Sequence, residues 1–274
     1  MTPLAGDRAA RSSLAELFPD GDYRFHLTLK RCEPREFFAA RDASGAVLAE
    51  RRRWIAAEPA CYAALQPEGE PLLAEFDALC AGWGLLETRR PRRVSPDAGE
   101  GARASADVLR EFGGSLEPDI LFLSPDAQGD LCLRGGALVF PTGWALTEKI
   151  GQSLDAIHGV VPGLNPAMGA AIRQFLARLK PGAAFLRDNW GLATTDELNL
   201  HPARALAAPA PPVALERLWL RVEHQALVAL PETGGVLFGI RIALHRLDTI
   251  AGTPAAAGLR RAPRKTRAAR TASA

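Results

Sequence analysis

The sequence lacks the features that mark several large classes of protein. It has no run approaching the about 18 consecutive apolar residues that a membrane-spanning helix needs. Residues 1–12 contain charged side chains and no apolar segment, so we expect no secretory signal. The motifs GxGxxG, GxxxxGK[ST], HExxH and GxSxG are also missing. The sequence therefore predicts no nucleotide-phosphate loop, no zincin helix and no nucleophile elbow.

Cysteine is scarce, and acidic residues are missing from the end of the chain. Cys32, Cys61, Cys80 and Cys132 form no CxxC pair, so we expect no zinc knuckle and no iron–sulfur cluster. Reduced thiols in a cytoplasmic protein are the simplest interpretation. The last twenty residues hold six basic side chains and no acid, and without these six the formal charge of +2 becomes −4 (+2 less 6). A nucleic-acid-binding body is therefore not predicted, whereas a solvated basic tail is.

The first half of the chain changes from helical to strand-rich patterning. We predict a strand at Tyr23–Leu29 and helices between Glu33 and Cys80, where Leu72, Phe76 and their neighbours form one apolar stripe. The segment Arg89–Ala104 is rich in proline, arginine, glycine and serine, which predicts a connector. Two strands should follow, one at Asp119–Leu123 and one around Gly135-Gly136.

Two helices and a hairpin are predicted for the second half. Apolar residues at i, i+4 and i+7 favour a helix over Thr147–His158, which Gly159 ends. A second helix should begin with Asn165 as N-cap and Pro166 at its first position. Alternating residues on both sides of Pro231–Gly235 predict an antiparallel hairpin.

The register of this hairpin decides which polar side chains meet. If the turn centres near Thr233, then Gln225 lies opposite Arg241. We then expect Arg221, Glu223, Gln225 and Arg241 to share one polar face. Side chains on that face would be close enough to build a site together.

The order of these elements is typical of an α+β protein with a PAS-like antiparallel sheet and flanking helices. We expect residues 1–104 to form a helical N-terminal extension packed on the core. Residues 105–250 would form the PAS-like core, and residues 251–274 a disordered basic tail. The helix pattern ExxxGxxx that begins at Glu148 is similar to one found in PAS domains.

Two histidines are candidate ligands of a metal or haem. His158 closes an amphipathic helix and precedes the rigid segment Gly-Val-Val-Pro-Gly, so its imidazole can face a cavity between helix and sheet. The alternative is a helix-terminal histidine that interacts with the last carbonyl groups. His224 alternates with Leu220 and Val222 toward the apolar side, where a hydrogen-bonded core histidine is the alternative.

A carboxylate and a polar–aromatic cluster are further candidates. Glu223 lies between two polar residues of the first hairpin strand. It is either a salt-bridged surface group or a hydrogen-bonding carboxylate that lines a ligand site. Arg187, Asn189 and Trp190 follow the second predicted helix, and they form either a capping turn with a packed tryptophan or part of the same site.

Several blocks of sequence together resemble the alpha-subunit family of haem-dependent oxidative N-demethylases. The blocks are Phe140–Trp144 (FPTGW), Glu148–Gly151 (EKIG), Ile157–Gly163 (IHGVVPG), Arg187–Trp190 (RDNW), Trp219–Glu223 (WLRVE) with Gln225, and Leu230–Arg241 (LPETGGVLFGIR). The blocks follow the family's order and cover residues 23–247. The chain departs from the pattern at Leu164, where an aromatic residue is common, and at His224, where an arginine is expected.

The resemblance implies a haem enzyme that depends on partner subunits. Such a domain binds haem b, activates O₂ and oxidises an N-methyl group of a small secondary amine to give formaldehyde and a shorter amine. Its electrons come from NADPH through a partner reductase that holds FMN and a 2Fe–2S cluster. The lack of nucleotide and cluster motifs in this chain is consistent with electrons that arrive from a partner. Neither nucleic acid nor a membrane is an expected partner.

The resemblance also implies roles for the candidate residues. His158 would be the axial iron ligand, with His224 as the alternative. Glu223 would be the group near the reacting centre, where a carboxylate can pair with the ammonium of an amine substrate.

Basic and aromatic side chains would complete the haem pocket. Arg221 and Arg241 would pair with the haem propionates, because a guanidinium fork matches a carboxylate. Trp144 and Trp190 would wall the pocket. Two non-catalytic functions stay open beside the enzyme: a haem or small-molecule sensor, and a scaffold subunit that has lost its haem.

Overall fold

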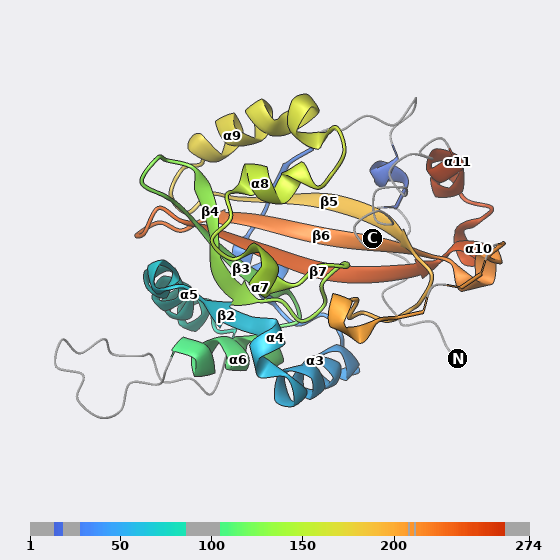
Figure 1. Cartoon of the computed structure of the whole chain (residues 1–274), viewed down its shortest axis with the longest axis horizontal. Helices are drawn as coiled ribbons and strands as arrows, with labels where there is room; N and C mark the ends of the chain where they lie inside the picture. The colour runs from blue at the N-terminus through green and yellow to red at the C-terminus, as the bar shows by residue number, and fades with distance from the viewer. Residues whose placement is uncertain (1–13, 19–27, 86–104, 208, 211, 261–274) are drawn as a thin grey trace.

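One seven-stranded antiparallel sheet organises the protein (Figure 1). The computed structural model describes residues 14–18, 28–85, 105–207, 209–210 and 212–260. The strands lie in the order β1-β5-β6-β7-β3-β4-β2, and all neighbouring pairs are antiparallel. Their bounds are β1 Lys30–Arg31, β2 Ala63–Leu65, β3 Asp119–Pro125, β4 Leu131–Ala137, β5 Ala184–Ala193, β6 Trp219–Ala229 and β7 Val236–Arg246. With helices on both faces, the protein is of the α+β class.

The predicted hairpin is confirmed as β6 and β7, but its register is one residue away from the prediction. Gln225 lies opposite Ile240, and Arg241 lies opposite His224. Because successive side chains of a strand point to opposite faces, this shift turns Arg241 away from Gln225. The prediction that Arg221, Glu223, Gln225 and Arg241 share one face is therefore wrong for Arg241.

The two predicted strands after residue 105 are confirmed as β3 and β4, and glycines in β4 let neighbouring strands approach closely. Gly135 and Gly136 have φ values of 137° and 151°. A Cβ atom on Gly136 would lie 2.0 Å from the carbonyl oxygen of Ile120 on β3. Only glycine fits such a backbone position without moving the neighbouring strand.

Helices from the first part of the chain cover one face of the sheet, which we call the first face. They are α2 (Pro34–Phe38), α5 (Glu70–Trp83) and α6 (Ser105–Ser115), joined by α3 (Ala46–Ala57), α4 (Pro59–Tyr62) and η2 (Pro67–Gly69). The predicted apolar stripe is confirmed in α5, where Leu72 and Phe76 are buried against Phe122 of β3 and Val228 of β6. The predicted helical region also contains β2, which pairs with β4 at the sheet edge.

The opposite face of the sheet, which we call the second face, is covered by α7 (Leu146–Lys149), α8 (Leu154–Gly159) and α9 (Ala170–Ala177) (Figure 1). The single helix predicted over 147–158 is wrong, because the chain forms two short helices. Gly151 between them has a φ of 83°, and its N–H donates to the carbonyl of Leu133 on β4. Gln152 accepts from the N–H of Leu133, so the segment docks on β4 instead of continuing the helix.

The start of the next helix also differs from the prediction. Asn165 does not cap it; its side-chain amide donates to the carbonyl of Asp155 in α8 at 2.7 Å. The residues Asn165–Gly169 form a π-helical turn, η3, that leads directly into α9. The predicted apolar stripe is present, since Ile172 is buried and Phe175 half-buried toward the sheet. Asn165 thus ties η3 to α8 across the second face.

Elements from both ends of the described chain pack together at one end of the sheet. They are η1 (Ala15–Leu17), α10 (Leu247–Ile250) and α11 (Pro254–Arg260), which share a cluster with Phe18 and Leu220. Ala255 and Ala256 of α11 are buried, so residues 254–260 of the predicted disordered tail are helical. Residues 261–274 lie outside the described residues, as do the predicted connector and residues 23–27 of the first predicted strand. Among the described helices, none is long and apolar enough to span a membrane.

Candidate functional site

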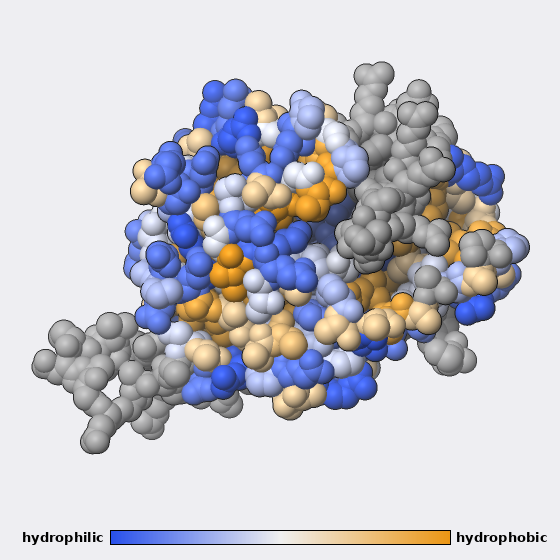
Figure 2. All heavy atoms as spheres, viewed as in Figure 1, coloured by the Kyte–Doolittle hydropathy of each residue, from blue (hydrophilic) through white to orange (hydrophobic). Residues whose placement is uncertain are grey.

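The middle of β5 and β6 presents a patch of polar side chains on the second face, the face that α7, α8 and α9 cover. Arg221, Glu223 and Gln225 alternate along β6 and point to the same side of the sheet. Asn189 lies opposite Glu223 on β5, and Arg187 lies opposite Gln225. Strand alternation and the β5–β6 register therefore bring together polar residues that are far apart in the sequence. In Figure 2, which views this side, hydrophilic surface lies beside an apolar patch over the end of α8.

The carboxylate of Glu223 is the centre of this patch. One of its oxygens accepts from the Thr142 hydroxyl at 2.7 Å. The other accepts from the side-chain amides of Asn189 at 3.1 Å and Gln225 at 2.8 Å. Glu223 stays half-buried, so these three donors fix an anion whose remaining lone pair can face a ligand.

Arg221 lies beneath the patch and is 2% exposed. Its Nε donates to the Thr142 hydroxyl at 2.9 Å, and its Nη2 donates to the carbonyls of Phe140 and Leu198 at 2.9 and 2.8 Å. Burial lowers the pKa of Arg221 to about 10, although Glu223 opposes the shift. These contacts make Arg221 a positioning residue for Thr142 and Glu223, and they occupy the donors that were predicted to pair with a propionate.

Arg241 lies on the first face and is not part of the patch. Its guanidinium forms an ion pair with Glu117 and donates to the carbonyls of Phe37 and Ala39 at 2.7 and 2.9 Å. Burial lowers its pKa to about 10, with Glu117 as the main opposing influence. Arg241 therefore holds α2 to the sheet, and the structure does not support its predicted place in a haem pocket.

His158 lies on the second face, near the C-terminal end of α8, and is half-buried. Its pKa is lowered from 6.5, chiefly by burial and then by the charge of Arg187. The neutral imidazole, the form that binds a metal, is thus favoured. Within the described part of the chain, neither ring nitrogen makes a hydrogen bond, which argues against the helix-terminal alternative.

The other predicted pocket residues divide between the two faces. Trp144 belongs to the cluster that includes Ile157 of α8, and the Lys149 ammonium lies 4.8 Å from the centre of its ring. Trp190 points to the first face and packs against Phe18, with ring centres 5.0 Å apart. The structure therefore brings Trp144, and not Trp190, to the side of His158.

His224 also points away from His158. It lies on the first face opposite Arg241, and its Nδ1 is 2.7 Å from a carboxylate oxygen of Asp188. Its side chain is 32% exposed, so it is a partly exposed, hydrogen-bonded histidine in the middle of β6. This position matches the alternative interpretation of His224 more closely than the role of an axial ligand.

Sequence reasoning missed the role of Thr142, which connects Arg221 to Glu223. The backbone around Thr142 is held by the segment that follows β5: Gly143 donates to the carbonyl of Leu200, and Leu200 donates to that of Pro141. The only signal in the sequence is the Thr-Gly pair in a turn, since Gly143 has a φ of 72°. The hydroxyl's partners lie 79 and 81 residues away, which no local pattern reveals.

His201 supports the same segment, and the burial of its ring predicts that stability depends on pH. Its Nδ1 accepts from the N–H of Ala203, and its Nε2 is buried without a partner among the described residues. Burial lowers the pKa of His201 from 6.5, so the unfolded chain binds a proton more readily. We expect the stability that His201 contributes to be present above pH 6.5 and lost as the pH falls toward the folded-state pKa.

This expectation is tested by urea unfolding of the wild-type protein and of His201→Gln, in which the free energy of unfolding is measured at a series of acidic pH values. The variant should show a shallower loss of stability below pH 6.5, because it cannot take up that proton. Equal slopes for the two proteins would contradict the assignment. The variant's stability above that pH provides the baseline for the comparison.

The described residues contain no group of three or more histidine, cysteine, aspartate or glutamate side chains that would hold a metal ion. A site with one histidine in a partly apolar setting is instead suited to a cofactor that brings most of its own ligands, as haem does. Fold and site together define an α+β domain that carries a half-buried histidine of lowered pKa and a hydrogen-bonded carboxylate on the same face of its sheet.

A family model described as "Haem-dependent oxidative N-demethylase, alpha subunit-like" matches residues 29–269. The match covers most of the chain, and the protein therefore belongs to this family. This confirms the resemblance found in the sequence blocks.

Proposed function

We propose that the protein is a haem-dependent oxidative N-demethylase subunit that binds haem b through His158. The observation behind this proposal is the state of that histidine in a chain of this family: half-buried, kept neutral by burial, and without a ring hydrogen bond among the described residues. A neutral imidazole of this kind is a common axial ligand of haem iron. The alternative axial ligand, His224, is directed to the other face and bound to Asp188.

The residues around His158 suit a haem. Arg187 and Lys149 both act electrostatically on His158, so two cations lie near the place where propionates need partners. Trp144 and Ile157 supply apolar surface on the same side. Haem, when bound, supplies the redox-active iron at which O₂ chemistry takes place.

Glu223 is the group that we assign to the substrate. A small methylated amine is a cation near neutral pH, and a desolvated cation needs a carboxylate or an aromatic face. Thr142, Asn189 and Gln225 hold the Glu223 carboxylate in place. The carboxylate therefore loses little conformational entropy when an amine binds. The chain's own contribution is thus to orient the amine with its N-methyl group toward the cofactor.

Electrons for this reaction would come from partner subunits in the cytoplasm. The family description includes the words alpha subunit, which supports a chain that works within a larger assembly. We propose a partner reductase that carries electrons from NADPH through FMN and a 2Fe–2S cluster. Consistent with this, the sequence contains no nucleotide-binding loop and no cluster cysteines.

The same proposal includes a PAS-like haem-binding core at residues 105–250, which holds β3 to β7 and α7 to α9. Residues 1–104 would be an extension packed on it. In support, β1 and β2 hydrogen-bond to β5 and β4 at the two edges of the sheet. The basic tail would then begin after α11.

The proposal is tested by titrating the purified chain with haem and recording its absorbance. We expect a Soret band that saturates at one haem per chain and that is lost in His158→Ala. The control is His224→Ala, which removes a histidine of similar exposure from the other face and should leave the band unchanged. Circular dichroism of both variants shows whether they are folded.

Each other outcome has a definite meaning. Full haem occupancy in folded His158→Ala would overturn the assignment of His158 as the axial ligand. Loss of haem in His224→Ala alone would identify His224 as that ligand. If the chain binds no haem, the proposed enzyme function is rejected, and a scaffold subunit becomes the favoured function. Haem binding without amine-dependent shifts of the band, or without loss of such shifts in Glu223→Gln, would favour a sensor.

A further inference from the structure

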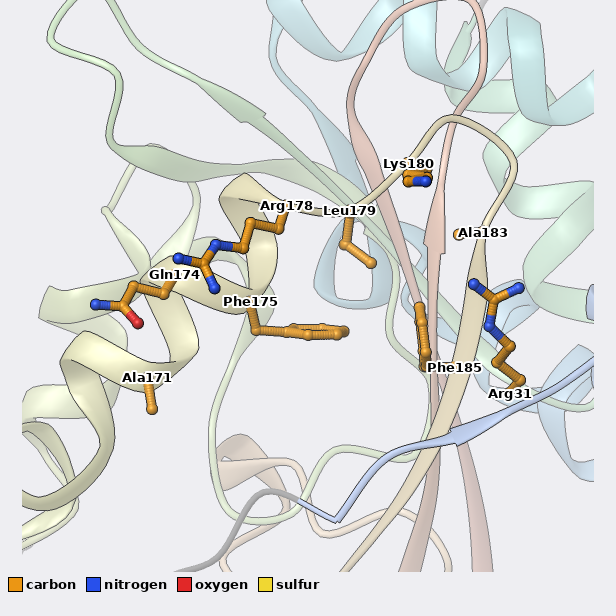
Figure 3. Close-up of a pocket in the computed structure, with 9 residues that line it drawn as sticks. All are labelled: Arg31, Ala171, Gln174, Phe175, Arg178, Leu179, Lys180, Ala183 and Phe185. Carbon is orange, nitrogen blue, oxygen red and sulfur yellow. The ribbon is translucent and has the colours of Figure 1, made fainter.

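A cavity of about 430 Å³ lies between α9 and the edge of the sheet formed by β1 and β5 (Figure 3). This volume falls within the range of small-molecule sites, roughly 300–1,000 Å³. Phe175 points from α9 toward Phe185 of β5, and Arg31 of β1 lies on the far side of Phe185. Arg178 and Lys180, which follow α9, complete the rim. The cavity is thus built by Arg31 of β1 and by the segment 171–185, which are distant in the sequence.

The charge around this cavity has one sign. Arg31, Arg178 and Lys180 all line it, and no aspartate or glutamate does. Their side chains are exposed, and within the described ranges no carboxylate forms an ion pair with any of them. Three cations around one cavity repel each other, and a bound anion would relieve that repulsion.

The floor of the cavity is aromatic. The rings of Phe175 and Phe185 meet edge to face with their centres 5.3 Å apart, and the Arg31 guanidinium lies 5.7 Å from the centre of the Phe185 ring. Both phenylalanines are only half-buried, so apolar ring surface faces the open volume. A flat apolar group would cover this surface and gain free energy from its burial.

We propose that this cavity binds a small aromatic anion, whose ring lies against Phe175 and Phe185 and whose acidic group pairs with the surrounding cations. The proposal does not depend on haem binding. Phe185 precedes Arg187 by two positions, so the cavity adjoins the patch of Glu223 on the same face without including any of its residues. A second ligand could therefore bind beside the proposed haem site.

The test is isothermal titration calorimetry with 2-naphthoate as the probe, using the full chain before and after haem loading. We expect one site, with affinity that falls as salt is added. The neutral analogue 2-naphthalenemethanol and inorganic phosphate should each bind more weakly, since one lacks the charge and the other the ring. Arg178→Gln/Lys180→Gln should weaken naphthoate binding about tenfold, because each exposed ion pair contributes modestly.

The matched control is Arg110→Gln/Arg217→Gln, which removes two exposed cations outside the cavity and should bind naphthoate as the unchanged chain does. Equal weakening in both double variants would overturn the proposal, as would equal binding of the neutral analogue or of phosphate. If haem loading excluded naphthoate while Arg178→Gln/Lys180→Gln also lost haem, the cavity would belong to the haem site. Naphthoate binding by a chain that takes up no haem would support this inference while the proposed function fails.

Discussion

Replacing Asp119 by alanine is expected to lower the free energy of unfolding by about 3–5 kcal/mol, because it leaves a buried charge without its partner. Asp119 and Arg51 form an ion pair at 2.9 Å, and both side chains are almost completely buried. Asp119 also accepts from the N–H groups of Val139 and Phe140 at 2.6 and 3.2 Å. The alanine variant would leave both amides without an acceptor and the guanidinium without its anionic partner.

Urea unfolding of Asp119→Ala measures this loss. Asp107→Ala is the control: it removes the carboxylate of an exposed ion pair with Arg110 and should cost under about 1 kcal/mol. If Asp119→Ala does not fold, Arg51→Met/Asp119→Leu still tests the argument, because it removes both charges and should be more stable than the single variant. Equal losses in Asp119→Ala and Asp107→Ala would contradict it.

This ion pair matters for the site because it fixes the segment that leads to Thr142. Arg51 also donates to the carbonyls of Gly113 and Glu117, which joins α3 to α6 and to the loop before β3. Its guanidinium lies 5.1 Å from the centre of the Phe140 ring. Helix α3, strand β3 and the residues before Thr142 are therefore held by one buried arginine.

Local patterns predicted β3, β4, β6, β7 and the apolar stripe of α5 because a single periodicity governs each of them. They did not predict β2, which lies within the region predicted to be helical. The prediction of the hairpin register was wrong for a geometric reason. Ala229 pairs with Val236, so six residues connect the strands and the turn centres between Glu232 and Thr233, not on Thr233. A shift of half a residue in the turn moves the pairing by one position, and this sends Arg241 to the other face.

The prediction of one helix over 147–158 was wrong because hydrophobic periodicity carries no information about competing hydrogen-bond partners elsewhere in the chain. Ile150, Leu154 and Ile157 all pack in the cluster on the second face, as a continuous helix would require. The chain nevertheless leaves the helical path at Gly151, where exchange of backbone hydrogen bonds with Leu133 compensates for the break. Pairing with a distant strand is a property of the whole fold, so the local pattern cannot predict it.

The candidate site was predictable in its residue types and not in its connections. Alternation along β6 placed Glu223 with Arg221 and Gln225, and the position at the end of a predicted helix singled out His158. The partners of Glu223 on β5 and in the loop of Thr142 depend on strand order, which the sequence alone did not establish. The faces of Trp190 and His224 likewise follow from the register of β5 with β6.

Arg221→Met is expected to destabilise the protein by about 2–4 kcal/mol and to loosen the site, because buried carbonyl groups lose their charged donor. The carbonyls of Phe140 and Leu198 each receive a hydrogen bond from Nη2, and Thr142 receives one from Nε. Methionine fills much of the volume but donates nothing. The segments on each side of Arg221 would then lose their common anchor, and the hydroxyl of Thr142 would no longer be fixed toward Glu223.

Urea unfolding gives the change in stability, and hydrogen–deuterium exchange shows where it acts. Exchange should rise at residues 140–143 and 197–201 in Arg221→Met, and much less in β3 and β4. Among the described residues, the guanidinium hydrogen-bonds to those first two segments and not to β3 or β4. Arg217→Met is the matched control: its side chain is exposed at the end of η5 (Leu215–Arg217), so stability and exchange should stay close to those of the wild-type protein. A uniform rise in exchange over the sheet would show that Arg221 supports the whole fold, and the same exchange as in the control would show that Thr142 is held without it.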